Sequence, residues 1–149
     1  MEILEVGEKL EDRTYDFRNV CFGLVEKDEQ FMLVYTHKDR NHSMPGGGIE
    51  EGETPEEAIR REFLEEAGYE IDSAEELVRV HCFWNWKDKT YGAERFAHIF
   101  VVKLKEETKQ TPLEDWHTRV YVDSKDVIDL IPFPYQKAGI EYYFNKFKR

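Results

Sequence analysis

The amino-acid sequence predicts an α+β protein in which helices pack on the faces of a mostly mixed or antiparallel sheet. Three observations lead to this class: short apolar runs of strand length, a long segment over 78–87 that alternates apolar and polar residues, and segments with helical start signals. The chain has 149 residues, the size of one ordinary domain, and no repeat or shift in composition divides it. We therefore expect one domain over residues 1–149.

The first predicted strands are the apolar runs 19–25 and 30–36, which the polar sequence EKDE separates. Two such runs on either side of a short polar break are typical of strands joined by a turn. We expect a hairpin here. Cys21 in the first run and Cys82 further along both lie among apolar neighbours, so we expect buried free thiols.

An acidic helix is predicted over residues 55–67. Thr54 can cap its start, Pro55 suits the first helical position, Glu57 completes a capping box, and Gly68 can end it.

The faces of this helix follow from the helical repeat of about 100° per residue. The apolar residues Ile59, Phe63 and Ala67 share one stripe that can pack on the sheet. The adjoining stripe gathers three carboxylates, and these are Glu62, Glu65 and Glu66.

Two long strands are predicted next. Apolar residues at every second position from Val78 to Trp86 indicate a half-buried strand, and the near-continuous apolar run 95–104 indicates a central strand returning beside it. The segment 118–122 predicts a further short strand. Ser124 can cap a helix that runs through Leu130, and 134–147 predicts a final amphipathic helix with proline in its first turn.

Charge limits the possible partners. A net charge of -11 and a pI of about 5.0 argue against non-specific binding to nucleic acid or to an anionic membrane, because both would repel the surface. A small or metal-screened substrate fits better. The first residues lack the basic start and apolar stretch of a secretion signal, and no segment is long enough to span a bilayer, so we expect a cytoplasmic protein.

The carboxylate stripe has two readings. The first is that the stripe is simply exposed to solvent, as acidic helix faces commonly are. The preceding sequence PGGG, residues 45–48, supports the other, because a glycine-rich turn can direct backbone carbonyls at a ligand. Carbonyls beside clustered carboxylates form an oxygen-rich site, which suits Mg²⁺ or Mn²⁺ and not zinc.

The same residues resemble the signature of the Nudix hydrolases, G-x5-E-x7-R-E-U-x-E-E-x-G-U, in which U is a bulky apolar residue. The matching residues are Gly47, Glu53, Arg61, Glu62, Phe63, Glu65, Glu66, Gly68 and Tyr69. The resemblance implies a Nudix-type α/β/α sandwich with a mixed sheet, in which the signature forms a loop-helix-loop. It also implies Mg²⁺-dependent hydrolysis of the diphosphate linkage of a nucleoside diphosphate derivative, such as a nucleoside triphosphate or a nucleotide sugar.

Site roles also come from this resemblance. It assigns Glu62, Glu65, Glu66 and the Gly46 carbonyl as metal ligands. Arg61 is expected to hold the loop against the helix by charge-assisted hydrogen bonds, with Glu53 in the same shell.

Several alternatives stay open. Glu62, Glu53 or an acidic residue of a later loop, Glu114 or Asp115, could deprotonate the water, although a solvated loop explains the last two equally well. His81 and His98 fall within strands, where structural histidines are common.

The substrate is also open. The chain lacks the tyrosine that diadenosine polyphosphate hydrolases carry beyond the signature and the proline of ADP-ribose hydrolases. Strand aromatics, namely Phe83, Trp84, Trp86, Tyr35 and Tyr91, either stack on a nucleobase or belong to the core. A non-catalytic Nudix-fold nucleotide-binding module is the main alternative function, and a calcium-binding acidic protein is a third, without the EF-hand pattern.

Overall fold

The computed structural model describes residues 1–105 and 116–148. Its elements in chain order are β1 Ile3–Val6, β2 Thr14–Leu24, β3 Glu26–Lys27, β4 Gln30–Thr36, β5 Asn41–Ser43, β6 Gly46–Gly48, α1 Pro55–Glu62, the π turn η1 Phe63–Ala67, β7 Glu70–Asn85, β8 Tyr91–Lys105, β9 His117–Asp123, α2 Val127–Leu130 and α3 Pro134–Phe147.

Two sheets organise the described part of the chain. The larger sheet has the order β1-β7-β8-β2-β6, in which β1 runs parallel to β7 and β2 parallel to β8, while β7–β8 and β2–β6 are antiparallel. In the second sheet β4 pairs with β3, β5 and β9, always antiparallel. The mixed sheet and the α+β class are therefore confirmed.

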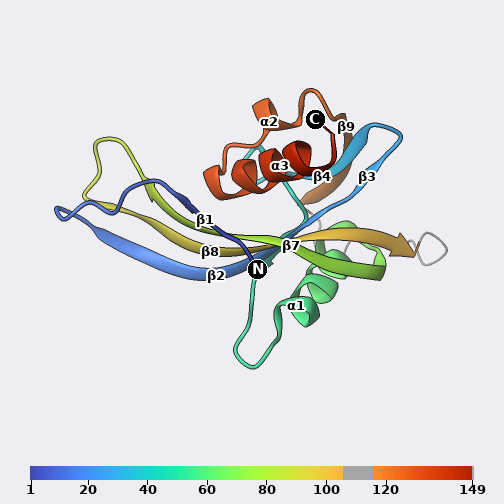
Figure 1. Ribbon diagram of the computed structural model, residues 1–149, viewed down its shortest axis with the longest axis horizontal. Helices are drawn as coiled ribbons and strands as arrows, with labels where there is room; N and C mark the ends of the chain where they lie inside the picture. Colours follow the sequence, from blue (N-terminus) through green and yellow to red (C-terminus); the bar gives the residue numbers. More distant parts are fainter. Residues whose placement is uncertain (106–115, 149) are drawn as a thin grey trace.

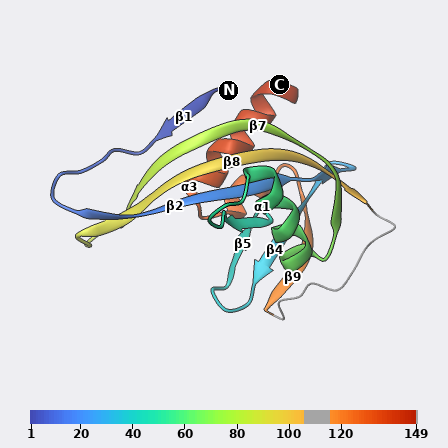
Figure 2. The same ribbon diagram turned by 90° about the horizontal axis from the view of Figure 1, so that it is seen from below.

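Helices cover both faces of the larger sheet. In Figure 1, α3 and α2 lie on one side of it and α1 on the other, and Figure 2 shows α1 across β2 and β8. Each side has its own apolar core. The core on the α3 side includes Val78, Val80 and Ile99, and the core on the α1 side includes Ile59 and Phe63. The layers follow the α/β/α sandwich that the resemblance implied.

The period-two and helical patterns are reproduced. Val78, Val80 and Cys82 are fully buried in β7, and β8 lies in the middle of its sheet. Helix α3 has the bounds predicted for it. Cys21 and Cys82 are buried free cysteines. In the described part of the chain, no helix combines the length and the apolarity needed to cross a membrane.

The predicted hairpin is wrong in its pairing. The run 19–25 does not pair along its length with 30–36, because β2 lies between β8 and β6 while β4 belongs to the second sheet. Only Glu26–Lys27 forms a short hairpin with β4, across Asp28 and Glu29, which both have positive φ. The apolar runs Val20–Leu24 of β2 and Phe31–Val34 of β4 are buried on both faces, and such continuous runs do not indicate which strand lies alongside.

Two helix predictions also need correction. The predicted helix 55–67 is an α-helix only to Glu62, and it continues as the π turn Phe63–Ala67. Ser124 does not cap the next helix, because its hydroxyl donates to Glu26 (2.7 Å) and the N-cap residue is Asp126. The Ser124 hydroxyl therefore bonds to a carboxylate far away in the sequence and does not cap the helix.

Candidate metal and diphosphate site

The start of α1 is fixed by local hydrogen bonds. The Thr54 hydroxyl accepts from the Glu57 N–H (3.1 Å), and the Glu57 carboxylate accepts from the Thr54 N–H (2.9 Å), so the capping box is complete. Pro55 occupies the first helical position, as predicted, and Gly68 ends the π turn with φ 73°. The helix is therefore held in place at both ends, and its carboxylates are carried on an ordered backbone.

The glycines before the helix allow an unusually close approach of the chain. Gly46 has φ 150°, and a Cβ placed there would lie 2.0 Å from the Cys21 carbonyl oxygen. A Cβ on Gly47 would lie 2.8 Å from Oε1 of Glu62. Strand β6 therefore passes between β2 and the Glu62 carboxylate, and at Gly46, where the close contact is with backbone, a larger residue would not fit.

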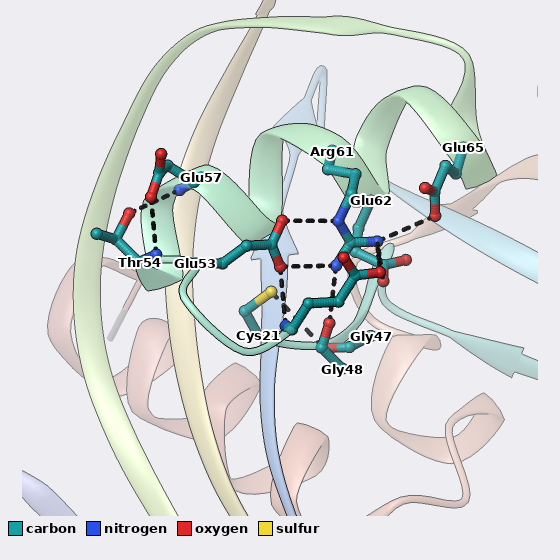
Figure 3. A network of polar contacts seen from close by, with 10 residues as sticks. Cys21, Gly47, Gly48, Glu53, Thr54, Glu57, Arg61, Glu62 and Glu65 are labelled. Carbon is teal, nitrogen blue, oxygen red and sulfur yellow. Dashed lines mark hydrogen bonds and ion pairs between the residues drawn. The ribbon is translucent and has the colours of Figure 1, made fainter.

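Arg61 is the centre of the site (Figure 3). Its guanidinium donates to both carboxylate oxygens of Glu53, through Nε (2.7 Å) and Nη2 (3.0 Å). Nη2 also donates to the Gly48 carbonyl (2.9 Å), and Nη1 to Glu62 (3.1 Å) and Glu65 (3.2 Å). One side chain thus links the loop, the glycine strand and the helix by charge-assisted bonds.

The pKa values of Glu53 and Glu62, which both contact Arg61, are shifted. Hydrogen bonds from Arg61 lower the pKa of Glu53, and in return Glu53 raises the pKa of the guanidinium further. Glu62 differs, since burial is the largest effect on it and raises its pKa, while Glu65 adds repulsion and Arg61 opposes both. The two carboxyls that contact the same arginine are therefore shifted in opposite directions.

Glu62 is more buried than predicted. The helical repeat places it on a carboxylate stripe beside the apolar one, yet only 8% of its surface is exposed. The sequence prediction of a separate stripe is wrong for this residue, because Gly47 packs against its carboxylate and Arg61 covers it. Burial of a carboxylate is costly unless it is paired, and here the guanidinium supplies the partner.

The backbone of Gly46 faces the carboxylates. Strand β6 is bonded to β2 on both sides of this residue, at the Pro45 carbonyl and at the Ile49 N–H (2.9 Å each). Because bonded positions alternate along an antiparallel strand, Gly46 directs its N–H and C=O away from β2. Its N–H lies 3.3 Å from Oε2 of Glu66. The Gly46 carbonyl thus lies along the edge of β6 that faces the helix.

The donor set fits a hard divalent cation. The Arg61 guanidinium contacts the carboxylates of four glutamates, and a fifth carboxylate accepts from the Gly46 N–H. The four are Glu50, Glu53, Glu62 and Glu65, and the fifth is Glu66. Within 1–105 and 116–148, no three His, Cys, Asp or Glu side chains are grouped around a common point for a metal ion. Instead Arg61 lies between Glu62 and Glu65. The structure thus places Glu62 and Glu65 on Arg61 and Glu66 on the Gly46 N–H, and in the described residues these side chains do not converge on one point.

Two members of this site were not singled out by the sequence prediction. Glu50 lies 3.7 Å from Arg61, and its N–H donates to Glu53 (2.9 Å). The Cys21 thiol contacts the Gly47 carbonyl from below (3.6 Å), and burial raises its pKa to about 12. The glycine-rich run pointed to the loop that holds Glu50, but no local signal connects Cys21 to it.

The remaining sequence candidates lie elsewhere. His81 contacts Glu5 through Nδ1 (2.9 Å) and Glu94 through Nε2 (2.7 Å), and His98 contacts Glu76 through Nδ1 (2.6 Å). Both histidines thus have carboxylate partners, as structural histidines do. Glu114 and Asp115 lie outside the described residues.

The strand aromatics separate into groups. Trp84 contacts Trp86 (ring centroids 5.8 Å apart), and Trp86 contacts Tyr91 (5.3 Å). Phe83 points to the opposite face of β7, since side chains alternate along a strand, and Tyr35 belongs to the second sheet. Only the first group lies together on one surface.

One cavity lies away from these residues. It measures about 840 Å³ and is bordered by the β3–β4 turn, the end of β9, α2 and α3. Glu26, Asp123 and Lys148 are among its lining residues, and none of the predicted site residues is.

Comparison with known proteins identifies the family. The family model described as "NUDIX domain" matches residues 17–142. "Nudix hydrolase 21, chloroplastic" from Arabidopsis thaliana is 25% identical over 118 residues, which cover 79% of this chain and 58% of that protein. "Nucleoside triphosphatase NudI" from Escherichia coli (strain SE11) is 31% identical over 96 residues, which cover 58% of this chain and 64% of that one.

Solved structures agree on the fold. A NUDIX hydrolase from Nitrosomonas europaea has a TM-score of 0.67 at 19% identity and covers 88% of this chain and 90% of that one. A MutT protein from Bacillus halodurans has a TM-score of 0.67 at 18% identity, covering 83% and 80% of the two chains. The present chain spans little more than half the length of the plant relative. With the family model matching most of its length and the signature residues gathered around Arg61, this chain belongs to the NUDIX domain family.

Proposed function

We propose that the protein is a Mg²⁺-dependent hydrolase, with Mn²⁺ as a possible substitute, that cleaves the diphosphate linkage of a nucleoside diphosphate derivative. The observation that carries the proposal is the group of carboxylates set around Arg61 and against the Gly46–Gly48 strand. Relatives named Nudix hydrolases and a nucleoside triphosphatase support the same class of reaction.

Charge explains why a cation belongs to this reaction. A diphosphate is itself anionic, so a cluster of glutamates would repel it without a cation between them. We assign Glu62, Glu65, Glu66 and the Gly46 carbonyl as the groups that would hold the cation. Glu66 accepts from the Gly46 N–H, the Glu62 carboxylate lies against Gly47, and Glu65 shares Nη1 of Arg61 with Glu62. When bound, Mg²⁺ supplies Lewis-acid stabilisation to the phosphoryl oxygens and lowers the pKa of water.

Arg61 and Glu53 have a different part in the proposal. Both oxygens of Glu53 accept from Arg61, and Arg61 also reaches Gly48, so this pair holds the loop in position. To hold a cation, Glu62 and Glu65 would have to give up their contacts with Nη1 of Arg61, and the bidentate contact with Glu53 would keep the guanidinium beside them. Glu62, Glu53 and the residues of the later loop remain the candidates for the group that deprotonates the water.

The aromatic group of Trp84, Trp86 and Tyr91 offers a place for the nucleoside. Trp84 packs near Tyr135 (6.4 Å), and Tyr135 packs on Phe22 (5.8 Å), which is registered with Gly46. Phe22, Trp84 and Tyr135 belong to the core on the α3 side of the larger sheet, whereas α1 lies on the other side, so a nucleoside stacked on them would reach the carboxylates past the edge strand β6. A half-exposed indole can stack on any base, which suits a nucleoside without predicting which one.

A panel of nucleotides tests the proposal. The protein is incubated with nucleoside triphosphates, nucleotide sugars and dinucleoside polyphosphates in Mg²⁺, and release of phosphate, diphosphate or nucleoside monophosphate is measured. We expect turnover of at least one compound that stops in excess EDTA, and a loss of orders of magnitude in Glu62→Gln but not in Glu56→Gln on the exposed side of the helix. Binding without turnover across the panel would instead favour the nucleotide-binding module, and full turnover in EDTA would contradict the metal assignment.

A further inference from the structure

The helix that carries the carboxylates ends in a π turn. In the π turn Phe63–Ala67, the Phe63 carbonyl accepts from the N–H of Gly68 and from that of Tyr69 (3.3 Å). Phe63 and Ala67 are both fully buried. The last carbonyls of a helix have no partner within it, and a buried carbonyl without a donor is costly. The Ala67 carbonyl therefore needs a donor from another part of the chain.

Arg119 supplies that donor. It lies in β9, registered with Val34 of β4 in the second sheet, and its Nη1 donates to the Ala67 carbonyl. Its guanidinium carbon also lies 5.3 Å above the ring of Tyr69, which is itself buried. The arginine thus meets the helix exit with a hydrogen bond and a cation–π contact together. A positive charge at the carbonyl end of a helix is additionally favourable.

Arg61 and Arg119 attach the helix to other elements on either side of Glu65 and Glu66. Arg61 bonds to the glycine strand before the π turn, and Arg119 bonds to the residue that closes it. Glu65 and Glu66 lie on the turn between these two attachments. A π turn contains one more residue than an α turn, so relaxation to α geometry would rotate Glu65 and Glu66 relative to Glu62.

We infer that Arg119 is a positioning residue, which holds the π turn so that Glu66 stays directed at Gly46 and Glu65 at Arg61. The inference rests on the proposed function, because it assigns Arg119 a part in cation binding. In this inference Arg119 acts through its hydrogen bond to the Ala67 carbonyl. Residues that orient metal ligands from outside the ligand shell typically change metal affinity by roughly 10- to 100-fold when replaced.

Three variants test this role. Arg119→Met keeps the length of the side chain but removes the donor and the charge, and Arg119→Lys retains the charge and one donor without the planar fork. Arg60→Met is the matched control, because Arg60 also ties the same helix to a backbone carbonyl, that of Ile71 (2.9 Å), on the part before the π turn. Thermal melts without metal establish that each variant is folded.

Two measurements are made on the folded proteins: amide hydrogen exchange of residues 63–69 in EDTA, and Mn²⁺ affinity without substrate. We expect Arg119→Met to exchange faster over this segment and to bind Mn²⁺ roughly 10- to 100-fold more weakly. Arg119→Lys should fall between it and the wild type. Arg60→Met should keep the wild-type Mn²⁺ affinity even where it melts earlier. If Arg119→Met does not fold, the same two measurements on Arg119→Lys test the inference.

The results separate the two proposals. Unchanged exchange or unchanged Mn²⁺ affinity in the folded Arg119 variants overturns the inference, and so does an equal loss of affinity in Arg60→Met. A wild-type protein that binds no Mn²⁺ overturns the metal assignment of the proposed function. In that case amide hydrogen exchange of residues 63–69 in EDTA still tests whether Arg119 holds the π turn.

Discussion

Replacement of Glu62 by Gln separates the folding role of this residue from its proposed catalytic role. The substitution preserves the shape and an acceptor oxygen for Arg61 Nη1, 3.1 Å away, and removes one negative charge from a buried position. Helix propensity is nearly unchanged between the two residues. Any change in the melting of the metal-free protein therefore reports the cost of the charge.

The magnitude follows from the neighbours of Glu62. Repulsion from Glu65, three residues on, is relieved by about 0.2 to 0.5 kcal/mol. Burial of the charge is relieved as well, whereas loss of the charge-assisted bond to Arg61 costs about 1 kcal/mol. The raised pKa of Glu62, caused mainly by burial, indicates that the folded protein favours the neutral form, so removal of the charge stabilises it at neutral pH.

We therefore expect Glu62→Gln to raise the free energy of unfolding in EDTA by about 0.2 to 1 kcal/mol, or about 0.5 to 4 °C in melting temperature for a chain of this size. Turnover in Mg²⁺ should fall by orders of magnitude, because a cation ligand is weakened. Calorimetric melts in EDTA and initial rates in Mg²⁺ are measured on the same preparation, with Glu56→Gln as control. A variant that unfolds without metal, or one that retains nearly the wild-type rate, would refute this reasoning.

Three more predictions use the same assays. Phe63→Ala should lower the free energy of unfolding by about 3 to 5 kcal/mol, seen in chemical denaturation, because the ring is fully buried; a loss under 1 kcal/mol would contradict the packing. Gly47→Ala should abolish most activity in a folded protein, measured as initial rate, since the new Cβ would lie 2.8 Å from the Glu62 carboxylate; wild-type rates would show that Glu62 can move freely. Hydrogen bonding to Glu94, aided by a contact with Glu5, raises the pKa of His81 above 6.5, so its contribution to stability is complete below pH 6.5 and disappears as the pH rises through the folded pKa. Melts across this range should therefore lose less stability with rising pH in His81→Gln, and identical pH profiles would argue against the pairing.

What the sequence could predict is local. The capping box at Thr54, Pro55 and the glycine at position 68 determine where the helical segment begins and ends, because these signals act within a few residues. The alternation through β7 and the bounds of α3 are likewise properties of neighbouring residues. The signature around Arg61 belongs to the same category, since its members lie within one loop and one helix.

What the tertiary structure decided depends on residues far apart in the chain. An apolar run predicts a buried strand but not its neighbour, so β2 pairs with β8 and β6 and not with the strand that follows it. The burial of Glu62 depends on the close approach of Gly47, and the form of the helix exit is linked to Arg119, which lies 52 positions beyond Ala67. Periodicity describes one element at a time, whereas the position of each carboxylate is set by contacts between elements, which only the folded chain brings together.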